Sequence, residues 1–202
     1  MIRTIIFDMG KVLIPFDFSR GYKALAAYSP FTADQIPREL SKTDLVIRLE
    51  CGRIEPRDFF DELRSTLKAE LSYEEFCRIW SCIFLPHTLI PEEFVVRLKL
   101  RYRVMVLSNT NAIHVEMLKE NYSILKQFDH LVFSHVVGAM KPEPKIYQAA
   151  IDNANCPPSE CFFTDDIPAY VEEARKAGIH AEQFLGFEKL QDDLTRHGVE
   201  WI

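Results

Sequence analysis

The chain has 202 residues, of which 48% are hydrophobic and 27% charged, and this composition is that of an ordinary globular protein. It excludes a disordered chain, and a chain of this length folds without help from disulfides or a structural metal. The 24 lysines and arginines are outnumbered by 30 aspartates and glutamates, which gives a formal net charge of -6. This acidic balance argues against nucleic acid or an anionic membrane as a partner.

The cysteines and the start of the chain indicate a cytoplasmic protein. The five cysteines show neither CxxC spacing nor a zinc-site pattern, as is typical of reduced thiols. The apolar run at residues 5–7 is too short for a signal peptide, and it ends at Asp8. No other stretch approaches the length of a membrane span. The sequence leaves the oligomeric state open.

Short apolar runs recur along the chain, as expected of strands that are buried on both faces. They lie at residues 2–7, 104–107, 131–133 and 161–163. Helical patterns accompany them at residues 91–101, 112–121, 144–155 and 168–177. This alternation predicts an α/β fold, with a Rossmann-like parallel sheet and helices on both of its faces.

Residues 16–87 interrupt the alternation. They show several amphipathic helical patterns and no strand pattern, with helix starts near residues 55–60 and 72–76. We therefore expect an α/β core formed by residues 1–15 and 88–202, with an all-helical insertion at residues 16–87.

Polar residues end these strands, and in a parallel sheet such residues converge at one edge. Asp8 follows the first strand, Ser108 the second, and Asp165 and Asp166 the fourth, while Lys141 lies beyond the third. Several carboxylates, a hydroxyl and an ammonium group at one edge suit Mg2+ beside a phosphate.

Each residue also has an ordinary structural interpretation. Asp8 could form a turn, residues 108–111 could cap the next helix, and Lys141 with Pro142 could form an exposed turn. The adjacent Asp165 and Asp166 are harder to explain in this way, because like charges side by side need a counterion.

The order of these segments resembles the haloacid dehalogenase (HAD) superfamily, most of whose members are magnesium-dependent phosphatases. The resemblance rests on residues 7–13, 106–111, 141–147 and 163–166, which match its four motifs in order. Residues 16–87 resemble its helical cap. The turn at residues 50–54 is similar to that of a subgroup with bacterial sugar-phosphate phosphatases and the phosphatase domain of soluble epoxide hydrolase.

The resemblance implies a role for each motif. Asp8 is expected to be the nucleophile that forms an aspartyl-phosphate. The expected Mg2+ ligands are Asp8, the Gly10 carbonyl and Asp165. Asp166 is expected either to bind the ion directly or to hold one of its ligands in place. A second acid usually stands two residues after the nucleophile, and here that position is Gly10, which has no side chain for proton transfer.

The remaining implied roles concern the phosphoryl group. Ser108 and the backbone amide of Asn109 are expected to donate hydrogen bonds to its oxygens. Lys141 is expected to neutralise the charge between the nucleophile and the phosphate.

The expected function is that of a magnesium-dependent phosphatase acting on a small phosphorylated metabolite such as a sugar phosphate. Two alternatives are a metal-independent haloacid dehalogenase, which has no use for the paired aspartates, and a catalytically weak protein that binds a phosphorylated metabolite. The insertion offers several large side chains that could wall a substrate site: Phe16, Phe18, Tyr22, Arg48 and Trp80.

Overall fold

The computed structural model describes residues 1–201. At its centre is a five-stranded sheet in which all strands run parallel in the order β3-β2-β1-β4-β5. The strands are β1 (Thr4–Phe7), β2 (Arg103–Ser108), β3 (His130–Phe133), β4 (Cys161–Asp165) and β5 (His180–Gln183). The predicted Rossmann-like α/β fold is confirmed.

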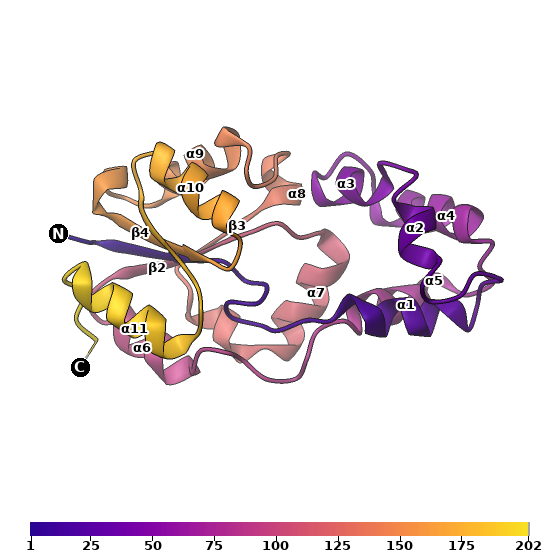
Figure 1. Cartoon of the computed structure of the whole chain (residues 1–202), viewed down its shortest axis with the longest axis horizontal. Helices are drawn as coiled ribbons and strands as arrows, with labels where there is room; N and C mark the ends of the chain where they lie inside the picture. The colour runs from indigo at the N-terminus through magenta and orange to yellow at the C-terminus, as the bar shows by residue number, and fades with distance from the viewer. Residues whose placement is uncertain (202) are drawn as a thin grey trace.

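Alternate residues of the central strand β1 enter two separate hydrophobic layers, because successive side chains of a strand point to opposite faces. Ile5 and Phe7 pack in one layer, and Ile6 packs in the other. The first face is covered by α6 (Glu92–Lys99), α7 (Ala112–Asn121) and α11 (Phe187–Arg196), and the second by α9 (Pro144–Asn153) and α10 (Pro168–Lys176). Figure 1 shows these two groups of helices below and above the sheet.

The sequence patterns located four of the five strands and missed β5. This edge strand pairs with β4 alone, and of its residues only Ala181 is buried. A strand with one buried side chain has no apolar run to reveal it. Two short helical turns, η1 (Ser123–Gln127) and η2 (Pro158–Glu160), complete the connections of the core.

The chain between β1 and α6 forms a set of helices, called here the helical region. It consists of α1 (Phe18–Ala26), α2 (Ile36–Leu40), α3 (Leu45–Glu50), α4 (Pro56–Leu67) and α5 (Tyr73–Ser81). These amphipathic helices bury their apolar faces in a hydrophobic cluster of their own, to which Ile113 of α7 adds a side chain from the core. Two helix starts are fixed by side-chain caps, since Asp17 accepts a hydrogen bond from the Ser19 amide and Ser72 accepts one from the Glu75 amide.

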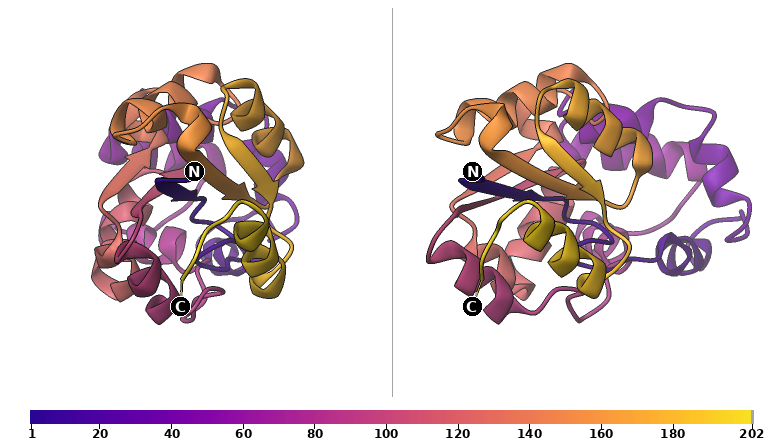
Figure 2. Two further views of the ribbon diagram at one scale, coloured as in Figure 1. Left: turned by 90° about the vertical axis from the view of Figure 1, so that its left-hand side faces the viewer. Right: turned by 60° about the vertical axis from the view of Figure 1, so that its left-hand side comes forward.

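Two connecting segments join the helical region to the core, and they run side by side. The Leu85 amide donates to the Pro15 carbonyl at 2.9 Å, and the Leu89 amide donates to the Leu13 carbonyl at 2.9 Å. Figures 1 and 2 show that the helical region projects from the end of the sheet opposite the two termini.

A second contact lies where the turn after α3 meets α8 (Ser134–Val137). Gly52 in this turn has φ +62, and a Cβ there would lie 2.0 Å from the His135 carbonyl oxygen. Glycine is therefore required for the backbones to approach this closely.

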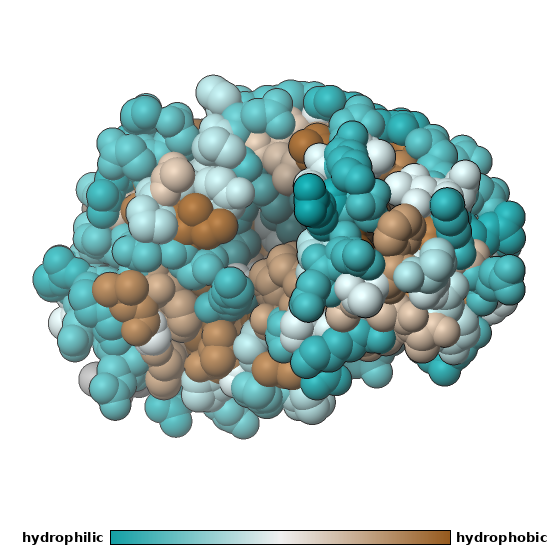
Figure 3. Space-filling view, turned by 45° about the vertical axis from the view of Figure 1, so that its right-hand side comes forward, coloured by the Kyte–Doolittle hydropathy of each residue, from teal (hydrophilic) through white to brown (hydrophobic). Residues whose placement is uncertain are grey.

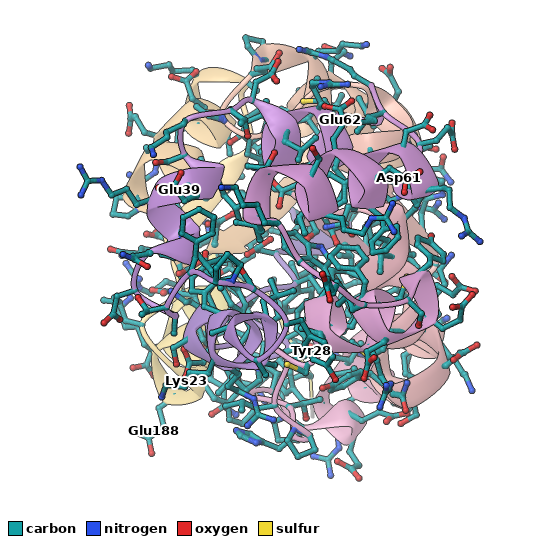
Figure 4. All side chains as sticks on the ribbon, turned by 90° about the vertical axis from the view of Figure 1, so that its right-hand side faces the viewer. Lys23, Tyr28, Glu39, Asp61, Glu62 and Glu188 are labelled. Carbon is teal, nitrogen blue, oxygen red and sulfur yellow. The ribbon has the colours of Figure 1, made fainter. Side chains whose placement is uncertain are left out.

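The outer surface of the helical region carries many charged side chains. Figure 4 faces this region end-on and shows Lys23, Glu39, Asp61 and Glu62 at its surface. From another side, Figure 3 shows a hollow between the core and the helical region. No helix within residues 1–201 is long and apolar enough to cross a membrane.

Candidate active site

Two carboxylates meet at the ends of neighbouring strands. Asp8 directly follows β1, and Asp165 is the last residue of β4. These strands pair in parallel, and the Asp8 amide donates to the carbonyl of Thr164 at 2.9 Å. Both side chains are therefore held at the same edge by the sheet itself.

Lys141 lies between these two carboxylates. Its Nζ is 2.7 Å from Oδ1 of Asp8 and 2.5 Å from Oδ2 of Asp165, and it also donates to the Leu107 carbonyl at 3.2 Å. Its side chain is 1% exposed, so these bonds replace its contacts with water. We call Asp8, Lys141, Asp165 and the adjacent Asp166 the strand-end cluster.

Asn109 fixes the loop that carries this lysine. Its Nδ2 donates to the Lys141 carbonyl at 3.0 Å, and its Oδ1 accepts from the Lys141 amide at 2.7 Å. Sequence reasoning assigned only the backbone amide of Asn109 to the site and missed this side-chain role. The Asn side chain carries one acceptor and two donors, so it can bond to both the amide and the carbonyl of one residue.

Burial and neighbouring charges set the protonation of the cluster. Burial raises the pKa of Asp8 to about 7, although the Lys141 ammonium acts to lower it. Burial acts to lower the pKa of Lys141, but the charges of Asp8 and Asp165 raise it overall. The pKa of Asp166 is raised by burial and then by the charge of Asp165. The cluster thus gathers more negative charge than one ammonium group can neutralise.

The carboxylates of the cluster form a set of candidate metal ligands. Asp8, Asp165 and Asp166 each offer an oxygen, and these oxygens lie within 4.8 Å of one another. An all-oxygen donor set suits a hard cation such as Mg2+. The donor chemistry therefore fits the expected metal.

Ser108 lies at the end of β2, next to the central strand, and is 2% exposed. Its hydroxyl contacts the carbonyl of Asn109 at 3.3 Å. The helix cap considered for this segment is made by Asn111, whose side chain accepts from the His114 amide at 3.1 Å at the start of α7. Capping thus falls to Asn111 and leaves the Ser108 hydroxyl at the strand end.

Gly10 lies in the loop after Asp8, beneath an aromatic ring. A Cβ at Gly10 would be 2.7 Å from Cε1 of Phe16, well inside van der Waals contact. The ring of Phe16 thus occupies the space next to the position at which a second acid would stand.

A search against family models matches residues 2–178 to haloacid dehalogenase-like hydrolases. The chain belongs to this family. Its membership agrees with the order of the four motifs and with the observed sheet.

Three related proteins illustrate the similarity. D-ribitol-5-phosphate phosphatase of Bacteroides thetaiotaomicron is 28% identical, with 100% of this chain and 95% of that protein covered. A HAD-like family hydrolase from Porphyromonas gingivalis has a TM-score of 0.82 at 29% identity and 99% coverage of both chains. A HAD family enzyme of B. thetaiotaomicron, solved with magnesium and inorganic phosphate, has a TM-score of 0.80 at 25% identity, covering 91% of this chain and 94% of the other.

Sequence reasoning on this HAD family member did not assign a role to Tyr170, in the first turn of α10. Its ring centroid lies 5.2 Å from Nζ of Lys141, and its carbonyl accepts from the Tyr147 hydroxyl at 2.9 Å. Burial raises the pKa of the Tyr170 phenol, and the charges of Asp165, Asp8 and Glu50 also raise it. The sequence did hold a signal for this position, because the helix that carries Tyr170 begins only three residues after the end of β4 and so starts near the cluster.

The large side chains of the helical region divide into three groups. Phe16 lies against Gly10. Phe18, Tyr22 and Trp80 line a cavity. Arg48 pairs with Glu62 at 2.9 Å and does not line the cavity.

Proposed function

We propose that this protein is a magnesium-dependent phosphatase that hydrolyses a small phosphorylated metabolite, with Asp8 as the nucleophile. The observation that carries the proposal is the buried strand-end cluster, in which Lys141 bonds to both Asp8 and Asp165. The names of the related proteins support a phosphate ester as substrate, and D-ribitol 5-phosphate indicates a sugar-alcohol phosphate as one candidate.

Asp8, Asp165, Asp166 and the carbonyl of Gly10 would hold Mg2+. When bound, the ion supplies positive charge that offsets the negative charge of the phosphate. It would also lower the pKa of Asp8, which burial raises to about 7, and so favour the ionised nucleophile.

The reaction then proceeds in two displacements at phosphorus. In the first, a carboxylate oxygen of Asp8 forms a bond to phosphorus while the ester oxygen leaves with the bonding electrons and takes up a proton. In the second, a water oxygen attacks phosphorus, the aspartyl–phosphate bond breaks, and inorganic phosphate and the Asp8 carboxylate are released.

Other residues of the chain bind and orient the phosphoryl group. Lys141 offsets the repulsion between the carboxylate and the phosphate, while the Ser108 hydroxyl and the Asn109 amide donate to phosphoryl oxygens. Since Gly10 has no acidic side chain, the leaving oxygen must take its proton from elsewhere. We further infer that residues 16–87 act as a cap over a core formed by residues 1–15 and 88–202.

The nucleophile is tested by Asp8→Asn. The amide keeps the shape of the carboxylate but is a very poor nucleophile, so we expect turnover of p-nitrophenyl phosphate with Mg2+ to fall by about a thousandfold or more. The matched control is Asp192→Asn, which changes an exposed aspartate of α11 and should retain activity. An Asp8→Asn variant that folds and keeps most of its turnover would overturn the role of Asp8.

The metal requirement separates phosphatase from dehalogenase. We expect EDTA to abolish phosphate release and Mg2+ to restore it, and we expect Mg2+ to raise the melting temperature of the wild type. Release of chloride from 2-chloropropionate in the presence of EDTA, without phosphatase activity, would instead identify a dehalogenase. Binding of phosphate esters with no turnover of any of them would indicate a binding protein.

A further inference from the structure

A cavity of about 400 Å3 lies inside the helical region, next to the core. Its walls come from α1, α2, α3 and α5, together with Ile83 and His114. Most of the lining is apolar or aromatic, and Glu50 is its acidic member. Neither this cavity nor a larger groove of about 830 Å3 between α5 and α7 is lined by residues of the strand-end cluster, and the groove is lined by several charged side chains.

Two aromatic side chains connect the cavity wall to the loop that follows Asp8. Phe18 in its wall packs on Phe16 with ring centroids 4.9 Å apart, and Phe16 in turn lies against Gly10. Elsewhere in the wall, Glu50 is close enough to Tyr170 for its charge to raise the pKa of that phenol. The ring of Tyr170 lies 5.2 Å from Nζ of Lys141. These contacts place the cavity beside the two residues, Gly10 and Tyr170, that flank the cluster.

Three polar side chains of the wall are already occupied, whereas Nε1 of Trp80 is a buried donor without a hydrogen-bond partner among the described residues. The hydroxyl of Ser41 donates to the Arg38 carbonyl at 2.9 Å, and that of Thr43 donates to the Leu40 carbonyl at 2.9 Å. Both ring nitrogens of His114 have partners as well, and burial lowers its pKa to about 4, so the ring is neutral. A polyol entering this cavity would lose its bonds to water and find few replacements, which is a costly exchange.

Besides the Trp80 donor, Glu50 offers the wall an acceptor. In the part of the chain that the structure describes, its carboxyl group has no hydrogen-bond or salt-bridge partner, and burial raises its pKa to about 7. Buried polar groups in native proteins are normally paired. A hydrogen-bond donor on a bound ligand would supply the missing partner.

We propose that this cavity is the subsite for the organic part of the substrate, and that it selects an apolar, ring-bearing alcohol with one hydrogen-bond donor that meets Glu50, over a polyol. The proposal rests on the proposed phosphatase function and deepens it. It separates this protein from the relative named for D-ribitol 5-phosphate, a substrate with several hydroxyls. The lack of an acid at Gly10 does not bear on this choice when the esters compared share one type of leaving oxygen.

The experiment measures kcat/KM, in the presence of Mg2+, for two esters of primary alcohols: 2-phenylethyl phosphate and D-ribitol 5-phosphate. Their leaving oxygens have similar basicity, so a difference reports recognition of the organic part. We expect the phenylethyl ester to be preferred by about tenfold or more, the range that an apolar pocket provides. Acetyl phosphate, whose organic part is too small to fill the cavity, serves as the general substrate.

Val46→Phe fills part of the cavity, and Val96→Phe makes the same change on α6, away from it. We expect Val46→Phe to lower kcat/KM for the phenylethyl ester about tenfold more than for acetyl phosphate, and Val96→Phe to change neither. Ile47→Trp, at a half-exposed wall position, is the second filling variant if Val46→Phe does not fold. A melting-temperature rise with 2-phenylethylphosphonate, larger than with methylphosphonate, gives a readout independent of turnover.

The role of Glu50 is tested with 2-phenylethyl phosphates that carry a para hydroxyl or a para aminomethyl group. The first offers a neutral hydrogen-bond donor and the second a cation. We expect at least one to exceed the parent ester in kcat/KM in the wild type, and Glu50→Leu to abolish that advantage. Equal rates for all three esters in the wild type would overturn the role of Glu50. Preference for D-ribitol 5-phosphate with normal acetyl phosphate turnover would overturn the subsite, whereas loss of turnover with every ester would instead refute the phosphatase function.

Discussion

The strand-end cluster is buried, whereas the cavity of the helical region has exposed residues such as Phe18 and Ile47 in its wall, and the two handle charge in opposite ways. In the cluster, Lys141 bonds to Asp8 and Asp165, and the backbone of Lys141 is itself clamped by Asn109. In the cavity, the Glu50 carboxyl stands among apolar side chains and lacks a protein partner within residues 1–201. A paired site is organised before a ligand arrives, and an unpaired one is completed by the ligand.

The two regions also differ in how the chain builds them. The cluster is assembled from segments that follow parallel strands, so the sheet fixes its geometry. The cavity is assembled from short helices around a separate hydrophobic cluster. The roles that we propose for the two regions, chemistry and recognition, therefore lie on different segments of the chain.

The first way to break this contrast is to remove the partner from the cluster with Lys141→Met. Asp8 and Asp165 would then be buried without a counter-charge, and removal of one partner from such a site costs about 3–5 kcal/mol. We expect urea melts to show a loss of this size without metal, a partial recovery with Mg2+, and a fall in kcat of about a thousandfold. Lys145→Met, at an exposed position in α9, is the matched control. Unchanged stability in Lys141→Met would show that the observed pairing contributes little.

The second test restores an acid to the cluster at Gly10. Because a Cβ there meets Phe16 at 2.7 Å, Gly10→Asp needs Phe16→Ala in the same chain. We expect the double variant to hydrolyse alkyl phosphates about ten to a hundred times faster than Phe16→Ala alone, with little gain for p-nitrophenyl phosphate, whose leaving group needs no proton.

The control for this test is Gly10→Asn in the Phe16→Ala background, which has the same shape but cannot donate a carboxylic proton. A wild-type enzyme whose rate is already independent of leaving-group pKa would show that another acid acts, provided that chemistry limits the rate.

The sequence predicted the core and the strand ends because simple rules connect them. Buried parallel strands show as apolar runs, and the residues that follow them must share an edge, as Asp8 and Asp165 do. The edge strand β5 was missed because only Ala181 is buried in it.

The environment of Glu50 is a different case. It depends on how α1, α2, α3 and α5 pack around the cavity and on how the turn after α3 meets α8, and no local pattern encodes this packing. In the sequence, Glu50 is only the first residue of the turn at residues 50–54. The ring of Phe16 over Gly10 was hidden for the same reason, because the contact joins a loop to the start of the helical region.

The smallest expected effect concerns Glu50→Gln and its dependence on pH. Burial raises the pKa of Glu50 from 4.5 to about 7, so the folded protein keeps a proton that the unfolded chain releases. The free energy of unfolding that this proton contributes in the wild type is fully present below about pH 4.5 and is lost as the pH rises through about 7. Glutamine has no proton to lose, so its contribution does not change with pH. We therefore expect the free energy of unfolding of Glu50→Gln to match that of the wild type at pH 4 and to exceed it at pH 8, by on the order of 2 kcal/mol in urea melts.

Glu188→Gln, at an exposed site on α11 that Figure 4 shows at the surface, is the control and should follow the wild type at both pH values. A Glu50→Gln variant that is less stable than the wild type at pH 8 would mean that the ionised carboxylate has a partner in the folded protein, and the contrast between a paired cluster and an unpaired cavity would then fail.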